Sequence, residues 1–162
     1  VYGNFDYSLN ASRMIEYSRG VPTEIDALYT ARDAGIINEG TELPESSNLL
    51  RQNGNPIWRV SSSLTWSSGP VRVGASATYV SSFFDTSLSN NGNYYRVDNH
   101  TVVNLYTQYS FDDSIAANTK VKLGIRNLFD RQPPLADQTF GYYGSVHSPL
   151  PRYIYINLQT EF

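Results

Sequence analysis

The sequence predicts an all-β protein built from antiparallel strands. Six segments alternate apolar and polar residues with a period of two, and turn residues such as Gly, Pro and Asn stand between them. Aromatic residues make up 14% of the chain, and aromatic side chains are enriched in strands. Helical periodicity is confined to one short stretch, so the six strands determine the fold class.

Each of the six expected strands has one apolar face and one largely polar face. They cover residues 2–11, 58–66, 71–79, 102–111, 120–126 and 153–162. No Lys, Arg, Asp or Glu falls on the apolar face of any of them. Because an Arg or Lys at the centre of a bilayer costs roughly 2 to 4 kcal/mol, this absence is expected of a surface that faces lipid. The side chains expected to face lipid include Val121, Leu123, Ile125, Ile154, Ile156 and Leu158.

The connections between these strands are short at one end and long at the other. Residues 67–70 form a tight turn and 112–118 a short one, whereas 18–56, 83–99 and 130–150 are long. Outer-membrane β-barrels have short periplasmic turns and long extracellular loops. The pattern therefore favours an antiparallel transmembrane β-barrel in the bacterial outer membrane, with the last strand ending on the periplasmic side. A soluble β-sandwich, with the apolar face turned into a core, has the same period and remains an alternative.

Aromatic residues stand near the ends of the expected strands. Trp58 and Trp66 bracket one strand, and eight residues of strand span about 26 Å, or about 20 Å after a 40° tilt. This is close to the apolar height of a membrane. Tyr79, Tyr109, Phe111 and Phe162 also lie at strand ends. The pattern is typical of an aromatic girdle, although strands are rich in aromatic residues in general.

The first long loop contains one expected helix, and the rest of the composition excludes several classes of protein. Residues 23–35 predict a short helix with Thr23 as its N-cap and Gly35 at its end. No run approaches the roughly 18 apolar residues of a spanning helix. A net charge of -3 argues against a nucleic-acid partner, and zero Cys excludes disulfides and thiolate metal sites. The first residues show no signal peptide.

The C-terminal third contains a sequence motif that resembles one found in a known protein family. Asn127, Leu128, Phe129 and Asp130 are followed by Pro133 and Pro134, then by Gly141-Tyr142-Tyr143, Arg152-Tyr153 and a terminal Phe162. In this order they resemble the end of a TonB-dependent outer-membrane receptor. Pro151 stands where many members of that family have Gly. Asn tolerates unusual φ, and Pro cannot donate to a β-ladder, so these residues also end a strand on physical grounds.

The resemblance implies that residues 1–162 are the C-terminal segment of a barrel of about 22 strands that encloses a plug. Plug and TonB box are expected outside this chain, with the TonB complex of the inner membrane contacted through that missing N-terminal part. Six strands are too few to close a barrel, so the remaining barrel and outer-membrane lipid are expected partners. The implied function is energy-coupled uptake of a scarce nutrient, such as a ferric siderophore, cobalamin or an oligosaccharide. The alternatives are a porin or translocator and, less favoured, a soluble carbohydrate-binding sandwich.

Neither a cofactor nor enzymatic activity is expected. His100 and His147 show no spacing to carboxylates that suggests a metal triad or a nucleophile relay, and Asp98-Asn99-His100 falls where polar residues are ordinary. The candidate ligand-binding residues are loop aromatics, which alternatively only pack the loops together: Tyr94, Tyr95, Phe140, Tyr142 and Tyr143. Lys120, Lys122 and Arg126 are expected in the lumen, either contacting acidic groups of the plug or lining a wet interior. Glu39, Glu42 and Glu45 are expected to be solvated.

Overall fold

The computed structural model describes residues 2–43, 47–90, 92–111 and 119–160. The chain divides into two compact units. The sheet unit consists of Val1–Arg13 and Arg51–Phe162, and the loop unit of Met14–Leu50.

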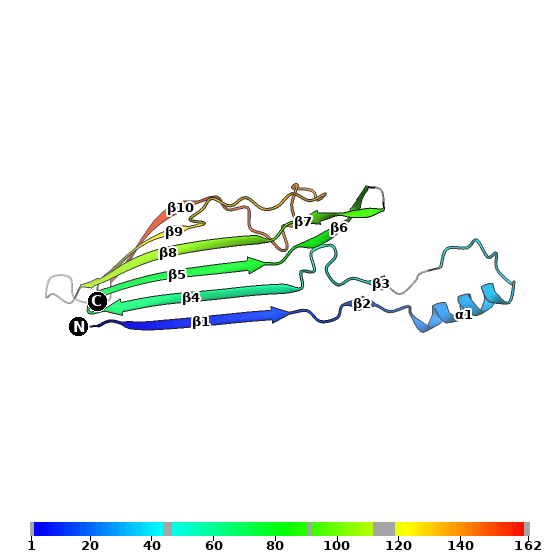
Figure 1. Ribbon diagram of the computed structural model, residues 1–162, viewed down its shortest axis with the longest axis horizontal. Helices are drawn as coiled ribbons and strands as arrows, with labels where there is room; N and C mark the ends of the chain where they lie inside the picture. Colours follow the sequence, from blue (N-terminus) through cyan, green and yellow to red (C-terminus); the bar gives the residue numbers. More distant parts are fainter. Residues whose placement is uncertain (1, 44–46, 91, 112–118, 161–162) are drawn as a thin grey trace. The chain divides into compact units, whose positions relative to one another are not determined.

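The sheet unit is built on one six-stranded antiparallel sheet with the order β1-β4-β5-β8-β9-β10 (Figure 1). The strands are β1 (Asn4–Arg13), β4 (Trp58–Ser68), β5 (Val71–Val80), β8 (His100–Phe111), β9 (Thr119–Arg126) and β10 (Tyr153–Gln159). All six predicted strands are confirmed, with bounds that differ by at most three residues. The all-β, antiparallel fold class is therefore confirmed. β1 and β10 each pair on one side only, so within the described residues the sheet is open and no barrel is closed.

The register of the sheet brings all the apolar faces to the same side. Directly opposed residues of an antiparallel pair lie on the same face of the sheet. One row of such partners crosses all six strands and contains only apolar and aromatic side chains: Tyr7, Leu64, Ala75, Leu105, Ile125 and Ile154. A one-residue slip at any pair would place side chains of the opposite face in this row. The alternation within each strand thus becomes one continuous apolar face.

This apolar face is exposed. Thirteen of its large hydrophobic side chains are more than a third exposed, from Leu105 at 37% to Ile156 at 74%. The residues expected to face lipid all lie on it. A soluble sandwich would need a second sheet against this face, and none of the described residues of the sheet unit supplies one. Among the described residues of the six strands, Arg13 is the one charged side chain on this face, at the end of β1, where its guanidinium carbon lies 5.6 Å from the Trp58 ring centroid.

The opposite face of the sheet is polar and carries tyrosines packed over glycines. One row across all six strands reads Asp6, Thr65, Gly74, Tyr106, Gly124 and Tyr155. A Cβ on Gly74 would overlap the Tyr106 ring, and one on Gly124 would overlap the Tyr155 ring. Lys122 Nζ lies 4.0 Å from the Tyr106 ring centroid. Glycine is required here because the rings lie directly against the backbone.

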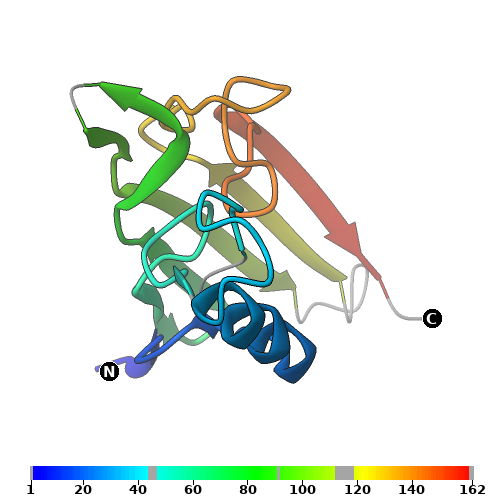
Figure 2. The same cartoon turned by 90° about the vertical axis from the view of Figure 1, so that its right-hand side faces the viewer.

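The connections sort to the two ends of the sheet as predicted. The β4–β5 turn, with Gly69 at φ +54°, lies where β1 begins and β10 ends, and the long connections leave from the opposite end (Figures 1 and 2). The expected short turn at 112–118 lies outside the described residues. The expected loop at 83–99 contains a hairpin that was not predicted, formed by β6 (Phe83–Asn90) and β7 (Asn93–Val97) with a register shift between Asp85 and Ser89.

The loop unit contains α1 (Thr23–Asp33) and a two-residue ladder between β2 (Ser18–Arg19) and β3 (Ser47–Asn48). The helix was predicted correctly, but its N-cap is Pro22 and no side chain caps it. The predicted Thr23 cap is wrong because Thr23 is already helical and the Pro22 carbonyl accepts the first bond, from the Ile25 amide. Gly35 ends the helix at φ +71°, as expected, in a Schellman pair of bonds. No helix among the described residues is long and apolar enough to cross a membrane.

Candidate functional site

The asparagine of the resemblance motif closes the base of the last long loop. Asn127 ends β9 at φ +50° and is 4% exposed. Its side-chain amide donates to the carbonyl oxygens of Arg131 and Leu150, both at 3.0 Å, and its Oδ1 accepts from the Arg131 amide at 2.9 Å. Its own backbone amide donates to Asn104 Oδ1 on β8 at 3.0 Å. Asn127 therefore joins the beginning of the loop, its end and the neighbouring strand.

The aspartate of the motif repeats this connection one turn later. Asp130, at φ +51°, accepts a hydrogen bond on Oδ1 from the Arg152 amide at 2.7 Å, just before β10 begins. Between them, Leu128 donates its amide to the Val103 carbonyl and Phe129 is 64% exposed. Pro133 and Pro134 follow in irregular backbone outside any strand, and Phe162 lies outside the described residues. The structural role of the motif is to hold the beginning and the end of the last long loop together by hydrogen bonds.

A small buried core lies beyond the end of the sheet. It consists of Phe83 and Val97 from the β6–β7 hairpin and Tyr143 from the last loop. The Phe83 and Tyr143 rings meet edge to face with centroids 5.0 Å apart. This core packs the β6–β7 hairpin against the last loop and so fixes the position of one relative to the other.

Asp85 is fully buried beside this core and ties the hairpin to the last loop. One oxygen accepts from the Ser87 amide and hydroxyl at 3.1 and 2.5 Å, and the other from the Asp137 amide at 2.9 Å. Burial by itself raises the pKa of Asp85, but these hydrogen bonds outweigh it and lower the pKa below the usual 3.8. Burial and the neighbouring Asp85 raise the pKa of Tyr143 to about 12. Asp85 is thus held as an anion.

Two histidines that are 47 positions apart in the sequence meet at the first residue of β8. The rings of His100 and His147 pack edge to face with centroids 5.1 Å apart, and His147 also stacks on Phe83 at 6.0 Å. His100 Nε2 and both ring nitrogens of His147 are buried without a hydrogen-bond partner among the described residues. Burial, together with His100 and Arg59, lowers the pKa of His147 to about 4. His147 is therefore a neutral packing ring at pH 7.

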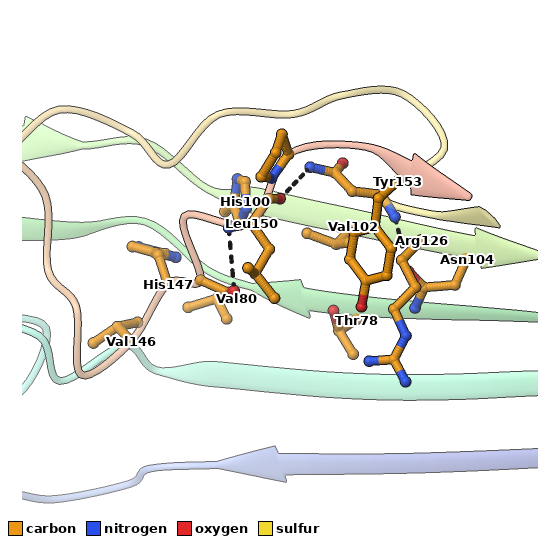
Figure 3. A pocket seen from close by; sticks show the side chains of 13 residues that line it. Thr78, Val80, His100, Val102, Asn104, Arg126, Val146, His147, Leu150 and Tyr153 are labelled. Atoms are coloured by element: carbon orange, nitrogen blue, oxygen red, sulfur yellow. Dashed lines mark hydrogen bonds between the residues drawn. The ribbon is translucent and has the colours of Figure 1, made fainter. Parts of the chain in front are cut away.

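A pocket of about 280 Å³ lies between the polar face of the sheet and the last long loop (Figure 3). Its floor comes from β5, β8, β9 and β10, and its roof from the loop residues before β10. Apolar walls are provided by Val80, Val102 and Leu150, and His147 closes one side. The sequence reasoning did not find this pocket, because it depends on a loop folding back over four strands. The one signal in the sequence that pointed toward this pocket was the position of Arg126 on the polar face of its strand.

The predicted ligand-binding aromatics fall into three places. Tyr94 and Tyr95 lie on β7, 49% and 42% exposed, beside a second hollow of about 510 Å³. Phe140 is 76% exposed, and its ring centroid lies 6.4 Å from that of Tyr142 in the last loop. Tyr143 is 7% exposed and packs in the core, so its ring has no free face for stacking. Among the described residues no ring contact joins these sets.

The remaining site expectations concern charged residues. The described residues hold no group of three or more His, Asp or Glu that could bind a metal ion. Asp98 pairs with Arg96 at 3.7 Å in an exposed position, while His100 turns to His147. Glu39 and Glu42 carry no ion pair within the described residues, and Glu45 lies outside them. Lys120, Lys122 and Arg126 all lie on the polar face, in register with Gln159, Asn157 and Tyr153 of β10.

Fold and site together define an all-β protein whose open antiparallel sheet has an exposed apolar face and, opposite it, a cation-rich polar face with a pocket. Comparison with known protein families, curated proteins and solved structures found no match.

Proposed function

We propose that this chain is the C-terminal part of a TonB-dependent outer-membrane receptor, which captures a scarce nutrient outside the cell and imports it with energy from the inner membrane. The observation that carries the proposal is the exposed apolar face across all six strands. A contiguous apolar surface larger than a few hundred Å² is unusual for a soluble monomer and is typical of a membrane or protein contact. Hydrocarbon tails are the occupant that fits a face without interior charge.

Strand length and the distribution of connections support the same proposal. A transmembrane β-strand needs about 9 to 11 residues, and β1, β4, β5 and β8 have 10, 11, 10 and 12. Within the sheet unit, the β6–β7 hairpin, the last long connection and the buried loop core lie together at one end of the sheet. Such an end suits the extracellular side, where a receptor meets its substrate.

The two open edges require a partner. The outer sides of β1 and β10 present unpaired backbone groups, which are not tolerated in hydrocarbon. In the proposed protein, the remaining strands of the barrel pair with both edges. The polar face then lines the lumen, and the implied plug lies against it.

The topology can be tested with single cysteines, because the 162 residues contain none. In a cysteine-free full-length protein, Phe140→Cys in the last long loop should react with a membrane-impermeant maleimide on intact cells. Ser68→Cys at the short turn should react only after the outer membrane is permeabilised. Equal labelling of both sites on intact cells, or recovery of the protein in the soluble fraction, would contradict the proposal.

The receptor class needs a second measurement. Cells that lack TonB should still bind the labelled nutrient at their surface but should not accumulate it. Candidate nutrients are a ferric siderophore, cobalamin and an oligosaccharide. Accumulation that is unaffected by loss of TonB would instead indicate a passive porin.

A further inference from the structure

Three exposed residues of the pocket carry polar groups that have no partner among the described residues. The buried ring nitrogens His100 Nε2, His147 Nδ1 and His147 Nε2, which belong to the same lining, also lack a partner in the described part of the chain, whereas Asn104 bonds to the Asn127 amide and to Ser76. The guanidinium of Arg126 and the hydroxyls of Thr78 and Tyr153, all on exposed residues, make no hydrogen bond or ion pair to a described residue and are open to a ligand. The guanidinium carbon of Arg126 only lies 5.9 Å from the Tyr155 ring centroid.

These three groups converge. Arg126 and Tyr153 are direct cross-strand partners at the point where β9 ends and β10 begins. Figure 3 shows the Tyr153 ring turned toward Thr78 on β5, with the Arg126 side chain extending to the same side. One cation and two hydroxyl donors thus border a single region, and the valine and leucine walls lie behind it.

The surroundings leave this cation unneutralised. The described strands carry Arg59, Arg72, Lys120, Lys122 and Arg126 on the polar face, against Asp6 as the single acid. Asp6 lies on β1, four strands away from Arg126 on β9 in the order of the sheet. The chain as a whole has a net charge of -3, so its acids are concentrated in the connections. The site therefore has an excess of positive charge and of donors.

We propose that this pocket binds a carboxylate. Arg126 pairs with the carboxylate, the hydroxyls of Thr78 and Tyr153 donate to its oxygens, and Val80, Val102 and Leu150 contact the adjoining apolar carbons. Arg presents a planar fork that matches a carboxylate better than a single ammonium does. At about 280 Å³ the pocket accepts a small acid or the acidic end of a larger molecule. The inference rests on the proposed function, because it places this group on the lumen side along the path of the substrate.

The carboxylate has two possible sources, a free small molecule or an acidic side chain of the protein that fills the lumen. Isothermal titration of the full-length protein in detergent with succinate, and with the neutral succinamide as a matched probe, separates them. A free ligand predicts binding of succinate but not of succinamide. Arg126→Gln then weakens succinate binding by about 10- to 100-fold, the loss expected for a charged hydrogen-bonded pair. Thr78→Val and Tyr153→Phe each weaken it by less.

If the carboxylate belongs to the lumen protein, the wild type does not bind added succinate. Arg126→Gln then lowers the unfolding temperature of the full-length protein, and Arg126→Lys restores part of the loss. Arg72→Gln, on the same face at the far end, is the control and should change neither reading. The inference is overturned if succinate does not bind and Arg126→Gln leaves the unfolding temperature unchanged. These readings do not depend on TonB or on cell-surface labelling, so they fail independently of the proposed function.

Discussion

The substitution Ile156→Arg distinguishes an apolar face that is covered by lipid from one that is in contact with water. Ile156 lies in the middle of β10, directly opposite Leu123, and is 74% exposed on the apolar face. In water, a substitution at so exposed a position changes stability by about 0.5 kcal/mol or less. In hydrocarbon, an arginine near the midplane costs about 2 to 4 kcal/mol.

The matched control is the next residue along the strand. Asn157 lies on the polar face opposite Lys122, so Asn157→Arg adds a like charge at a cost of about 0.2 to 1 kcal/mol. At 1.4 kcal/mol for each factor of ten, Ile156→Arg should lower the folding equilibrium about 30- to 700-fold, and Asn157→Arg about fivefold at most.

Assembly of the full-length protein can be followed by the difference in gel mobility between folded and heat-denatured barrels. Urea titration in lipid vesicles gives the change in free energy of unfolding. We expect Ile156→Arg to abolish or strongly reduce assembly and Asn157→Arg to assemble nearly as well as the wild type. If both variants assemble and unfold alike, the apolar face does not meet lipid and the reasoning is refuted.

Three further predictions concern the loop end of the molecule. Asn127→Ala should lower the free energy of unfolding by about 2 to 4 kcal/mol in a urea titration, because the variant lacks the loop hydrogen bonds of Asn127 and keeps a Cβ at φ +50°. Asn127→Gly lacks the same hydrogen bonds but has no Cβ, so it should cost about 1 kcal/mol less. Equal losses for the two variants would exclude a contribution from the backbone conformation. Asp85→Asn should speed hydrogen exchange at the Asp137 amide. Because the folded pKa of Asp85 is lowered, its stabilisation is complete above pH 3.8 and is lost as the pH falls through the folded value, so the wild type and Asp85→Asn should differ in exchange at this amide only above that value. A variant that exchanges as slowly as the wild type at neutral pH would argue against this role. His147 has a pKa of about 4 in the folded protein, against 6.5 when unfolded, so the thermal stability of the wild type should fall as the pH is lowered from 6.5 to about 4. His147→Phe should flatten this slope, because it removes the titrating group and keeps a ring against Phe83. An unchanged slope would assign the pH dependence to another group.

The six strands could be predicted from the sequence because their signal is local. Alternation in Tyr153–Gln159, for example, depends only on successive side chains pointing to opposite faces of a strand. The phase of each strand was also readable, and the ladder then brought Ile154, Ile125 and Leu105 into one row. The N-cap of α1 was mispredicted because Thr23 and Pro22 compete for one position, and local geometry placed the boundary one residue earlier.

The β6–β7 hairpin was missed because Phe83–Val97 lacks clean alternation and contains a register shift at Asp85. Its stability comes from contacts with a distant segment, the packing of Phe83 against Tyr143 and the bond from the Asp137 amide to Asp85. Tyr143 was grouped with the candidate ligand-binding aromatics of the loops for the same reason, and the structure bears out the alternative for it, that such a ring packs the loops together. Nothing in its neighbours along the chain distinguishes a ring that binds ligand from one that fills a core.

By itself, the sequence determined the strands, their apolar phase and the sorting of short and long connections, since each depends on residues a few positions apart. Only the tertiary structure decided which residues meet across the loops: His100 with His147, and Asp85 with the Asp137 amide. Such meetings depend on how a long connection closes over the sheet. That closure is set by packing and hydrogen bonding between distant residues, which leave no periodic pattern in the chain.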